Sequence, residues 1–261
     1  MTSIPADRLS RDSADAAPLA TAYRMIRRNV ADLLGGRRLA MTAVVPSCPD
    51  WTVRDLVTHL VDVAARVNAR VTSVDDSAVA GAAANKPVLV ITPVERTATS
   101  VTADVPTSDA AVRGLLDRWE RYAEPIDQFL SMPFSIDRGI LIMDTFTHEL
   151  DLRWALGVPP PIDHPARPIA MGILVKGFSA AVRTHRLPAV RIETEHGQWQ
   201  AGEGVPAAVM SGPWYDVYLA LSGRRSAEQI HALQWSADPA GWLSAFTWGP
   251  FTVPDAPDGA R

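Results

Sequence analysis

Cysteine is almost absent from this sequence, because Cys48 is the only one among 261 residues. No intrachain disulfide and no Cys-x-x-Cys redox pair can therefore form. If the protein uses thiol chemistry, we expect the reacting thiol to come from another molecule. An excess of one charge is also absent: the formal net charge is -4, and no block of about five like charges occurs. Nothing in this pattern indicates nucleic acid or an anionic membrane as a partner.

Long apolar runs are missing as well. The sequence has no stretch of roughly 18 consecutive apolar residues, the length that a membrane-spanning helix needs. Residues 1–17 carry Asp, Arg and Ser and lack an apolar centre, a composition that argues against a signal peptide. We therefore expect a cytoplasmic protein that has no membrane partner.

Enough apolar residues are present to form a substantial core. They make up 47% of the chain, against 21% charged residues, as in ordinary globular proteins. A length of 261 residues favours one large domain or two modest ones.

Four amphipathic segments follow a polar tail at residues 1–16. Their apolar residues recur at the three- and four-residue spacing of a helix face, over residues 19–34, 52–73, 109–130 and 139–157. Pro125 is expected to kink the third helix. Thr52 and Asp55 have the spacing of a capping box at the start of the second. Four such helices predict a four-helix bundle over residues 17–157, and bundle cores commonly hold metal sites.

The residues between the second and third helices do not follow this pattern. Residues 74–106 are rich in Ala and Thr and lose the helical period, although residues 88–91 have the composition of a short strand. A connection of this length is uncommon in a compact bundle and is often functional. We interpret it as a flap or an arm that contacts a partner.

A proline-rich linker at residues 158–168 predicts a domain boundary after the bundle. The following residues, 169–261, combine both kinds of element: helices at 169–185 and 214–222, a short helix capped by Ser226, and strands at 190–195, 198–201 and 207–211. The predicted fold class is therefore α+β, a four-helix bundle followed by a smaller mixed α/β domain. His164 in the linker and His196 at a turn are expected to be exposed.

Three side chains that can bind a metal share one face of the fourth predicted helix. Asp144, His148 and Asp151 fall within an arc of roughly 60° at helical spacing. Burial of these groups without partners costs free energy, and a divalent cation is the simplest compensation. His59 lies just past the edge of the apolar stripe on the second helix and can supply a further ligand. Catalytic zinc sites use three protein ligands and an open position.

Ordinary structural roles also explain each of these residues separately. His59 alone fits a hydrogen-bonded residue at the edge of the core. Asp144 and His148 fit a helix-surface pair at i,i+4, and Asp151 fits a pair with Arg153 or a solvated acid. Only the combination on two helices favours a metal site.

Two motifs resemble a known family. Residues Cys48–Leu60 contain Pro-x-Trp-Thr-x-x-Asp-Leu-x-x-His-Leu, and the fourth helix contains Asp144-x-x-x-His148-x-x-Asp151. Together they resemble the mycothiol-dependent maleylpyruvate isomerase family of actinobacteria, whose N-terminal half is a DinB-like metal-binding bundle. Residues Leu219–Arg225 are similar to the Gly-Arg element of the family's smaller C-terminal domain.

The resemblance implies a metal-dependent enzyme that uses a thiol, either a cis-trans isomerase or an S-transferase. The family's ligands map onto His59, Asp144 and His148, with Asp144 in the place of a Glu, and the divalent metal implied is Zn²⁺. Asp151 would orient His148 or act as a fourth ligand. Arg224 would bind a carboxylate of the substrate through its planar guanidinium and would also contact the cofactor. The implied thiol is mycothiol, whose coordinated thiolate would add to the activated double bond of a cis-enedioic substrate and leave after rotation.

Two other functions remain open from the sequence. One is a non-catalytic stress-response module that binds a metal or a partner protein. The other is a zinc hydrolase in which Asp151 or Glu149 serves as the base. The enzyme hypothesis predicts a small-molecule thiol and a small-molecule substrate as partners, and the sequence is compatible with a homodimer without specifying the oligomeric state.

Overall fold

The structure of the protein, a computed structural model, describes residues 16–35, 41–75 and 109–255. These residues form two compact units, one that ends at Ile169 and one that begins at Ala170. The predicted arm from residue 76 onward, with its short strand, lies outside the described residues, as does the predicted tail up to residue 15.

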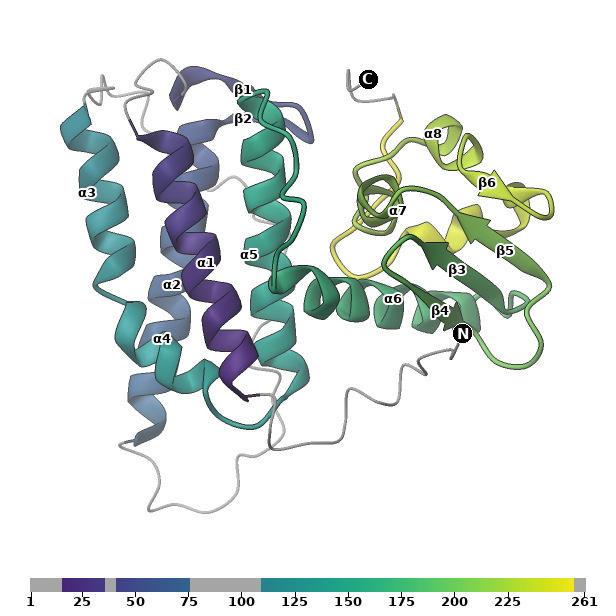
Figure 1. The fold of residues 1–261 in the computed structure, drawn as a ribbon, viewed down its shortest axis with the longest axis horizontal. Coiled ribbons are helices and arrows are strands. Elements are labelled where there is room, and N and C mark those ends of the chain that lie inside the picture. The colour runs from purple at the N-terminus through teal and green to yellow at the C-terminus, as the bar shows by residue number, and fades with distance from the viewer. Residues whose placement is uncertain (1–15, 36–40, 76–108, 256–261) are drawn as a thin grey trace. The chain divides into compact units, whose positions relative to one another are not determined.

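Amphipathic helices build the first unit (Figure 1). Their bounds are α1 Ala16–Leu34, α2 Val53–Asp75, α3 Asp109–Glu120, α4 Ala123–Leu130 and α5 Ile136–Ala155. Helix α1 packs against α4 and α5, and α2 packs against α3, α4 and α5. Within the described residues, the first unit is thus a four-helix bundle in which α3 and α4 together take the place of one helix. The predicted helical bundle is confirmed.

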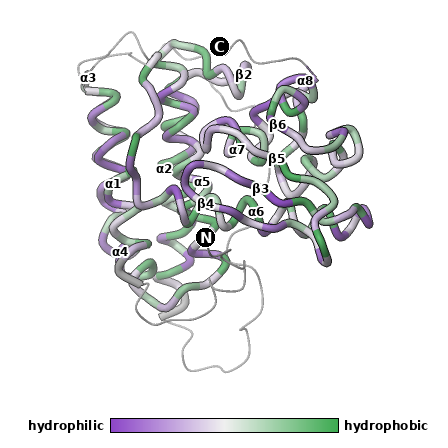
Figure 2. The backbone as a smooth tube through the Cα atoms, turned by 45° about the vertical axis from the view of Figure 1, so that its right-hand side comes forward, coloured by the Kyte–Doolittle hydropathy of each residue, from purple (hydrophilic) through white to green (hydrophobic). Residues whose placement is uncertain are grey.

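The bundle interior is filled by apolar side chains that recur at helical spacing. Among the most buried, each at most 2% exposed, are Ile26, Val30, Leu56, Leu60, Ile126 and Phe146. Figure 2 shows the corresponding alternation of hydrophobic and hydrophilic residues along these helices. Trp119 Nε1 donates to the Tyr23 hydroxyl at 2.9 Å, so two buried aromatic residues satisfy each other's polar ends.

The predicted third helix, residues 109–130, is broken near Pro125 into two helices. The prediction of one continuous, kinked helix was therefore wrong. Helices α3 and α4 are separate, and between them the Tyr122 N–H bonds the carbonyl of Trp119, only three residues back. Proline lacks the N–H that would bond the carbonyl four residues earlier, and its ring clashes with that carbonyl. That carbonyl belongs to Arg121, where the break lies.

A short hairpin, which was not predicted, precedes α2. Strands β1 (Val44–Val45) and β2 (Cys48–Thr52) pair in antiparallel fashion on either side of residues 46–47. The sequence did not predict the second strand because Pro49 and Asp50 are poor strand formers.

Side chains and backbone geometry define the ends of the two helices that matter most for function. At the start of α2, the Thr52 N–H bonds an Asp55 carboxylate oxygen at 2.8 Å, and the Asp55 N–H bonds Thr52 Oγ1 at 3.3 Å, which confirms the predicted capping box. Ser135 caps α5. At the other end of α5, Gly157 adopts φ 64°, a conformation that favours glycine.

The second unit contains a mixed sheet in the order β4-β3-β5-β6. The strands are β3 Val190–Thr194, β4 Gly197–Ala201, β5 Ala208–Ser211 and β6 Gln234–Trp235. Strand β3 pairs parallel with β5, and the other pairings are antiparallel. The accompanying helices are α6 Ala166–Thr184, which spans the division between the units, α7 Trp214–Leu221, α8 Ala227–His231 and the 3₁₀ helix η3 Pro239–Phe246. The predicted α+β class is confirmed.

Three details of the second unit differ from the prediction. Helix α6 begins at Ala166, inside the predicted linker, because Pro168 falls in the first helical turn, where no intrahelical N–H bond is needed. Strand β6 and helix η3 were not predicted, since short elements leave too few residues to show a period.

Across the described ranges, no helix has the length and hydropathy that crossing a membrane requires.

Candidate metal centre

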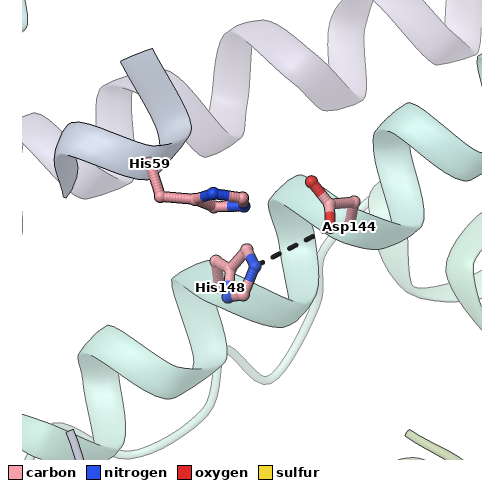
Figure 3. A group of neighbouring side chains, drawn as sticks. All are labelled: His59, Asp144 and His148. Carbon is pink, nitrogen blue, oxygen red and sulfur yellow. Dashed lines mark ion pairs between the residues drawn. The ribbon is translucent and has the colours of Figure 1, made fainter. Parts of the chain in front are cut away.

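Helix periodicity brings Asp144 and His148 to one face of α5, four residues apart, and His59 extends toward them from α2 (Figure 3). One potential ligand atom from each of the three residues lies within 4.8 Å of the other two. Each residue is largely withdrawn from solvent: Asp144 is buried, and the two histidines are half-buried. The structure therefore brings together all three ligands that the resemblance implied.

The distance between Asp144 and His148 is close to that between two ligands of a small tetrahedral cation. His148 Nε2 lies 3.7 Å from Asp144 Oδ1. Two ligands of a tetrahedral zinc ion with bonds of about 2.0–2.1 Å are separated by roughly 3.4 Å. The rings of His59 and His148 lie 5.0 Å apart between centroids and nearly perpendicular, at 83°. Asp144, although shorter than a Glu, thus reaches the imidazole of His148 closely enough to share a cation.

The electrostatic surroundings favour the form of His59 that binds a metal. Burial lowers its pKa to about 3, with smaller contributions from the neighbouring His148 and Arg66. At neutral pH the ring is therefore uncharged and keeps a nitrogen lone pair. The indole of Trp51, on β2, packs against the same ring with a centroid distance of 5.4 Å and an angle of 63°.

Asp151 contacts His148 from the side away from Asp144. Its Oδ2 lies 3.0 Å from His148 Nδ1, and its Oδ1 accepts a hydrogen bond of 2.7 Å from the hydroxyl of Ser47, in the β1–β2 loop. Asp151 is fully buried. It is therefore neither solvated nor paired with Arg153, which instead bonds Glu149 at 2.8 Å. Of the two roles that the resemblance implied for it, this geometry matches orientation of His148.

A second polar cluster occupies another face of α5. Glu149 is fully buried and accepts hydrogen bonds from Arg153 Nε at 2.8 Å and Asn29 Nδ2 at 2.9 Å. Burial raises the pKa of Glu149, and the bonds from Arg153 and Asn29 oppose that shift. The third neighbour is His164, whose Nε2 lies 3.4 Å from Glu149 Oε2. On a helix wheel, Glu149 lies about 100° from His148, away from the candidate ligands.

The prediction that His164 is exposed was wrong. The residue is 1% exposed, its ring stacks on Phe146 at 4.7 Å, and its Nδ1 accepts a hydrogen bond from the Ala166 N–H at 3.1 Å. Burial lowers its pKa to about 4. The prolines around His164 suggested an exposed linker. Proline content indicates a stiff backbone but does not determine whether a side chain of the linker is buried.

Arg224 lies in the second unit and is almost fully buried, with 8% of its surface exposed. Its Nη1 donates to the carbonyl oxygen of Ser222 at 2.6 Å, and its guanidinium lies over the ring of Phe251 at 5.7 Å. These contacts stabilise the chain after α7. A contact between Arg224 and a substrate or cofactor stays a prediction.

Two residues near the site were missed by the sequence analysis as functional candidates, Ser47 and Trp51. Both belong to the hairpin that was not predicted. The structure pairs Val45 with Cys48 across a loop of two residues. Two-residue loops are the commonest connections of hairpins, so this spacing was the signal in the sequence that could have predicted the hairpin.

The fold and the three clustered ligand residues define a class of protein, a helical bundle with a candidate His/Asp/His metal centre and a following α+β unit. Within this class, the family described as "Mycothiol maleylpyruvate isomerase N-terminal domain" matches residues 23–153, half of the chain. The chain belongs to that family, so the predicted resemblance is confirmed. Comparisons with curated proteins and with solved structures gave no significant match.

Proposed function

We propose that this protein is a metal-dependent enzyme that uses a small-molecule thiol, mycothiol in the first instance, to catalyse a cis-trans isomerisation or an S-transfer in the cytoplasm. The observation that carries the proposal is the convergence of His59, Asp144 and His148 within 4.8 Å. Membership of a family that includes a mycothiol-dependent isomerase supports the thiol and the reaction type. The family alone does not define the substrate, since one fold serves several chemistries.

The donor set fits a divalent ion such as Zn²⁺, because imidazole nitrogens and carboxylate oxygens are its common protein ligands. When bound, such an ion would supply Lewis acidity that lowers the pKa of a coordinated thiol or water. His59 and His148 would donate nitrogen lone pairs, and Asp144 would contribute the negative charge. Asp151 would hold the ring of His148 in place through Nδ1.

The geometry gives less support to the hydrolase alternative. Both oxygens of Asp151 are already engaged, one by Ser47 and one by His148. Glu149 lies on another face of α5 among Asn29, Arg153 and His164. A general base must reach the water that it deprotonates, whereas Asp151 is engaged by two other side chains and Glu149 lies on another face of α5.

Metal titration tests the site directly. We expect the chelator-treated protein to bind about one Zn²⁺ per chain, measured by calorimetry and by elemental analysis after dialysis. The substitutions His148→Ala and Asp144→Asn should each lower the affinity at least about tenfold, since even indirect metal contacts contribute that much. His185→Ala, at an exposed histidine, is the matched control and should bind like the parent. Unchanged affinity in both site variants would contradict the proposed centre.

Turnover assays then separate the candidate functions. We expect the zinc-loaded protein to isomerise a cis-enedioic acid only when mycothiol is added, followed by the change in ultraviolet absorbance. The Asp144→Asn variant should lose this activity. Hydrolytic turnover without a thiol would instead favour the hydrolase, and metal binding without any turnover would favour the non-catalytic module.

A further inference from the structure

We propose that Ser47 is a positioning residue of the candidate metal centre and acts on His148 through Asp151. The proposal rests on the proposed function, because it concerns how a candidate ligand is held. Ser47 Oγ and Asp151 Oδ1 are 2.7 Å apart, and Asp151 Oδ2 and His148 Nδ1 are 3.0 Å apart. The three side chains therefore form one hydrogen-bonded chain that runs from the β1–β2 loop to the imidazole.

The direction of the hydrogen bonds follows from the donor and acceptor capacity of each group. An ionised carboxylate only accepts, so the Ser47 hydroxyl and the His148 ring must both donate to Asp151. In the neutral form of the His148 ring, this hydrogen bond places the proton on Nδ1 and leaves the lone pair on Nε2. Nε2 is also the atom that lies 3.7 Å from Asp144 Oδ1. These hydrogen bonds thus favour the neutral tautomer of His148 whose unprotonated nitrogen, Nε2, is the one near Asp144.

Ser47 restrains Asp151 in two respects. A donor on Oδ1, in addition to the one on Oδ2, restrains rotation of the carboxylate about its terminal torsion and helps to define the plane of the group. Asp151 is fully buried, so water has little access to replace the serine hydroxyl. Removal of the hydroxyl would take this donor away from a buried acceptor and would weaken the restraint on the orientation of the carboxylate toward His148.

The hairpin that carries Ser47 also contacts the other candidate imidazole. Trp51, four residues further along the chain, packs its indole edge-to-face with His59 at 5.4 Å. The next residue, Thr52, is joined to Asp55 of α2 by the capping box. One short hairpin therefore contacts His59 of α2 directly and is linked to His148 of α5 through Asp151.

The first test measures the tautomer of His148 in the metal-free protein by ¹⁵N nuclear magnetic resonance of the imidazole nitrogens. We expect the parent to show the Nδ1-protonated form. Ser47→Ala should show a mixture of tautomers, and Ser47→Thr, which restores a hydroxyl, should return to the parent form. Ser131→Ala is the matched control, because Ser131 Oγ donates to the Asp127 carbonyl of α4, the helix that Ser131 follows.

The second test measures Co²⁺ affinity by its visible absorption in the same variants. We expect Ser47→Ala to bind about tenfold more weakly, the usual effect of losing an indirect ligand contact, and Ser47→Thr to recover most of the loss. Circular dichroism establishes that each variant folds. If Ser47→Ala does not fold, Ser47→Cys, which keeps the size but donates weakly, replaces it and should show the same two changes.

The outcomes separate this inference from the proposed function. A Ser47→Ala protein with the parent's tautomer and the parent's Co²⁺ affinity would overturn the role of Ser47 even if the metal centre is real. A parent that binds no metal would overturn the proposed function, whereas the tautomer measurement would still decide whether Ser47 positions His148.

Discussion

Gly177 is a residue where one added methyl group would meet tightly packed atoms. A Cβ at this position of α6 would lie 2.0 Å from Cζ3 of Trp248. The indole has little room to move, because its Nε1 donates to the Leu221 carbonyl at 3.1 Å and its ring packs on Phe251. The glycine is therefore required for close approach of helix and ring.

We expect Gly177→Ala to lower the free energy of unfolding by about 1–3 kcal/mol, the usual cost of overpacking a core. The measurement is urea denaturation followed by tryptophan fluorescence. The matched control is Gly241→Ala in the same unit, where an added Cβ meets nothing within 4 Å, and we expect little change there. Equal stabilities for the two variants would contradict the packing argument.

Polar residues on α5 show how a buried helix can carry charge. One face holds Asp144, His148 and Asp151, and another holds Glu149 with Arg153. Every unpartnered polar group buried in the bundle would cost free energy. The structure pairs Asp151 with His148 and Ser47, and Oε1 of Glu149 with Arg153 and Asn29. The helix therefore serves as a scaffold for two separate polar clusters.

The capping box of Thr52 and Asp55 joins the hairpin to α2, the helix that carries His59. Asp55 accepts from both the backbone N–H and the hydroxyl of Thr52, at 2.8 and 2.7 Å. We expect Asp55→Ala to lower the free energy of unfolding by about 1 kcal/mol, as for other helix caps. Asp55→Asn keeps an acceptor oxygen and should lose less. Chemical denaturation followed by far-ultraviolet circular dichroism measures both.

Thr72→Ala is the control for this capping effect. Thr72 is exposed near the other end of α2, and its hydroxyl bonds only carbonyls of its own helix. We expect a change below about 0.5 kcal/mol there. If Asp55→Ala is no more destabilising than Thr72→Ala, the capping box does not stabilise the junction.

The sequence predicted the long helices well because their apolar faces repeat over several turns. It placed Asp144 and His148 on one face of α5 for the same reason, since i,i+4 geometry is local. The approach of His59 depends on how α2 packs against α5, which no local pattern specifies, and its place at the edge of the stripe left two roles open. Ser47 was not predictable as a partner of Asp151, because the contact joins residues 104 positions apart.

At the scale of the whole molecule, length and composition allowed two modest domains, and the described residues do form two compact units. The exact limits of the linker did not follow from its prolines. The burial of His164 shows why: a proline-rich segment has a stiff backbone, but the bundle surface beside it determines which of its side chains are covered. Long-range packing thus decides the titration behaviour of that histidine.

His164 makes stability depend on pH in a defined direction. Its folded-state pKa is lowered to about 4 by burial and, to a lesser degree, by Arg153 and Arg167. The unfolded chain binds a proton near pH 6.5, whereas the native chain resists it. The stability from neutral His164 is therefore complete above about pH 6.5 and is lost as pH falls toward 4. A shift of this size corresponds to about 3 kcal/mol.

We expect His164→Asn to flatten the loss of unfolding free energy between pH 6.5 and 4, measured by urea denaturation at several pH values in metal-free protein. The Asn oxygen can replace Nδ1 as the acceptor for the Ala166 N–H, so the variant should fold. His185→Asn, at an exposed histidine, should keep the parent's slope. His59, whose pKa is also lowered, to about 3, remains in both variants and contributes equally. If the unfolding free energies of His164→Asn and the parent have the same pH dependence, the buried ring of His164 does not cause the loss of stability at low pH.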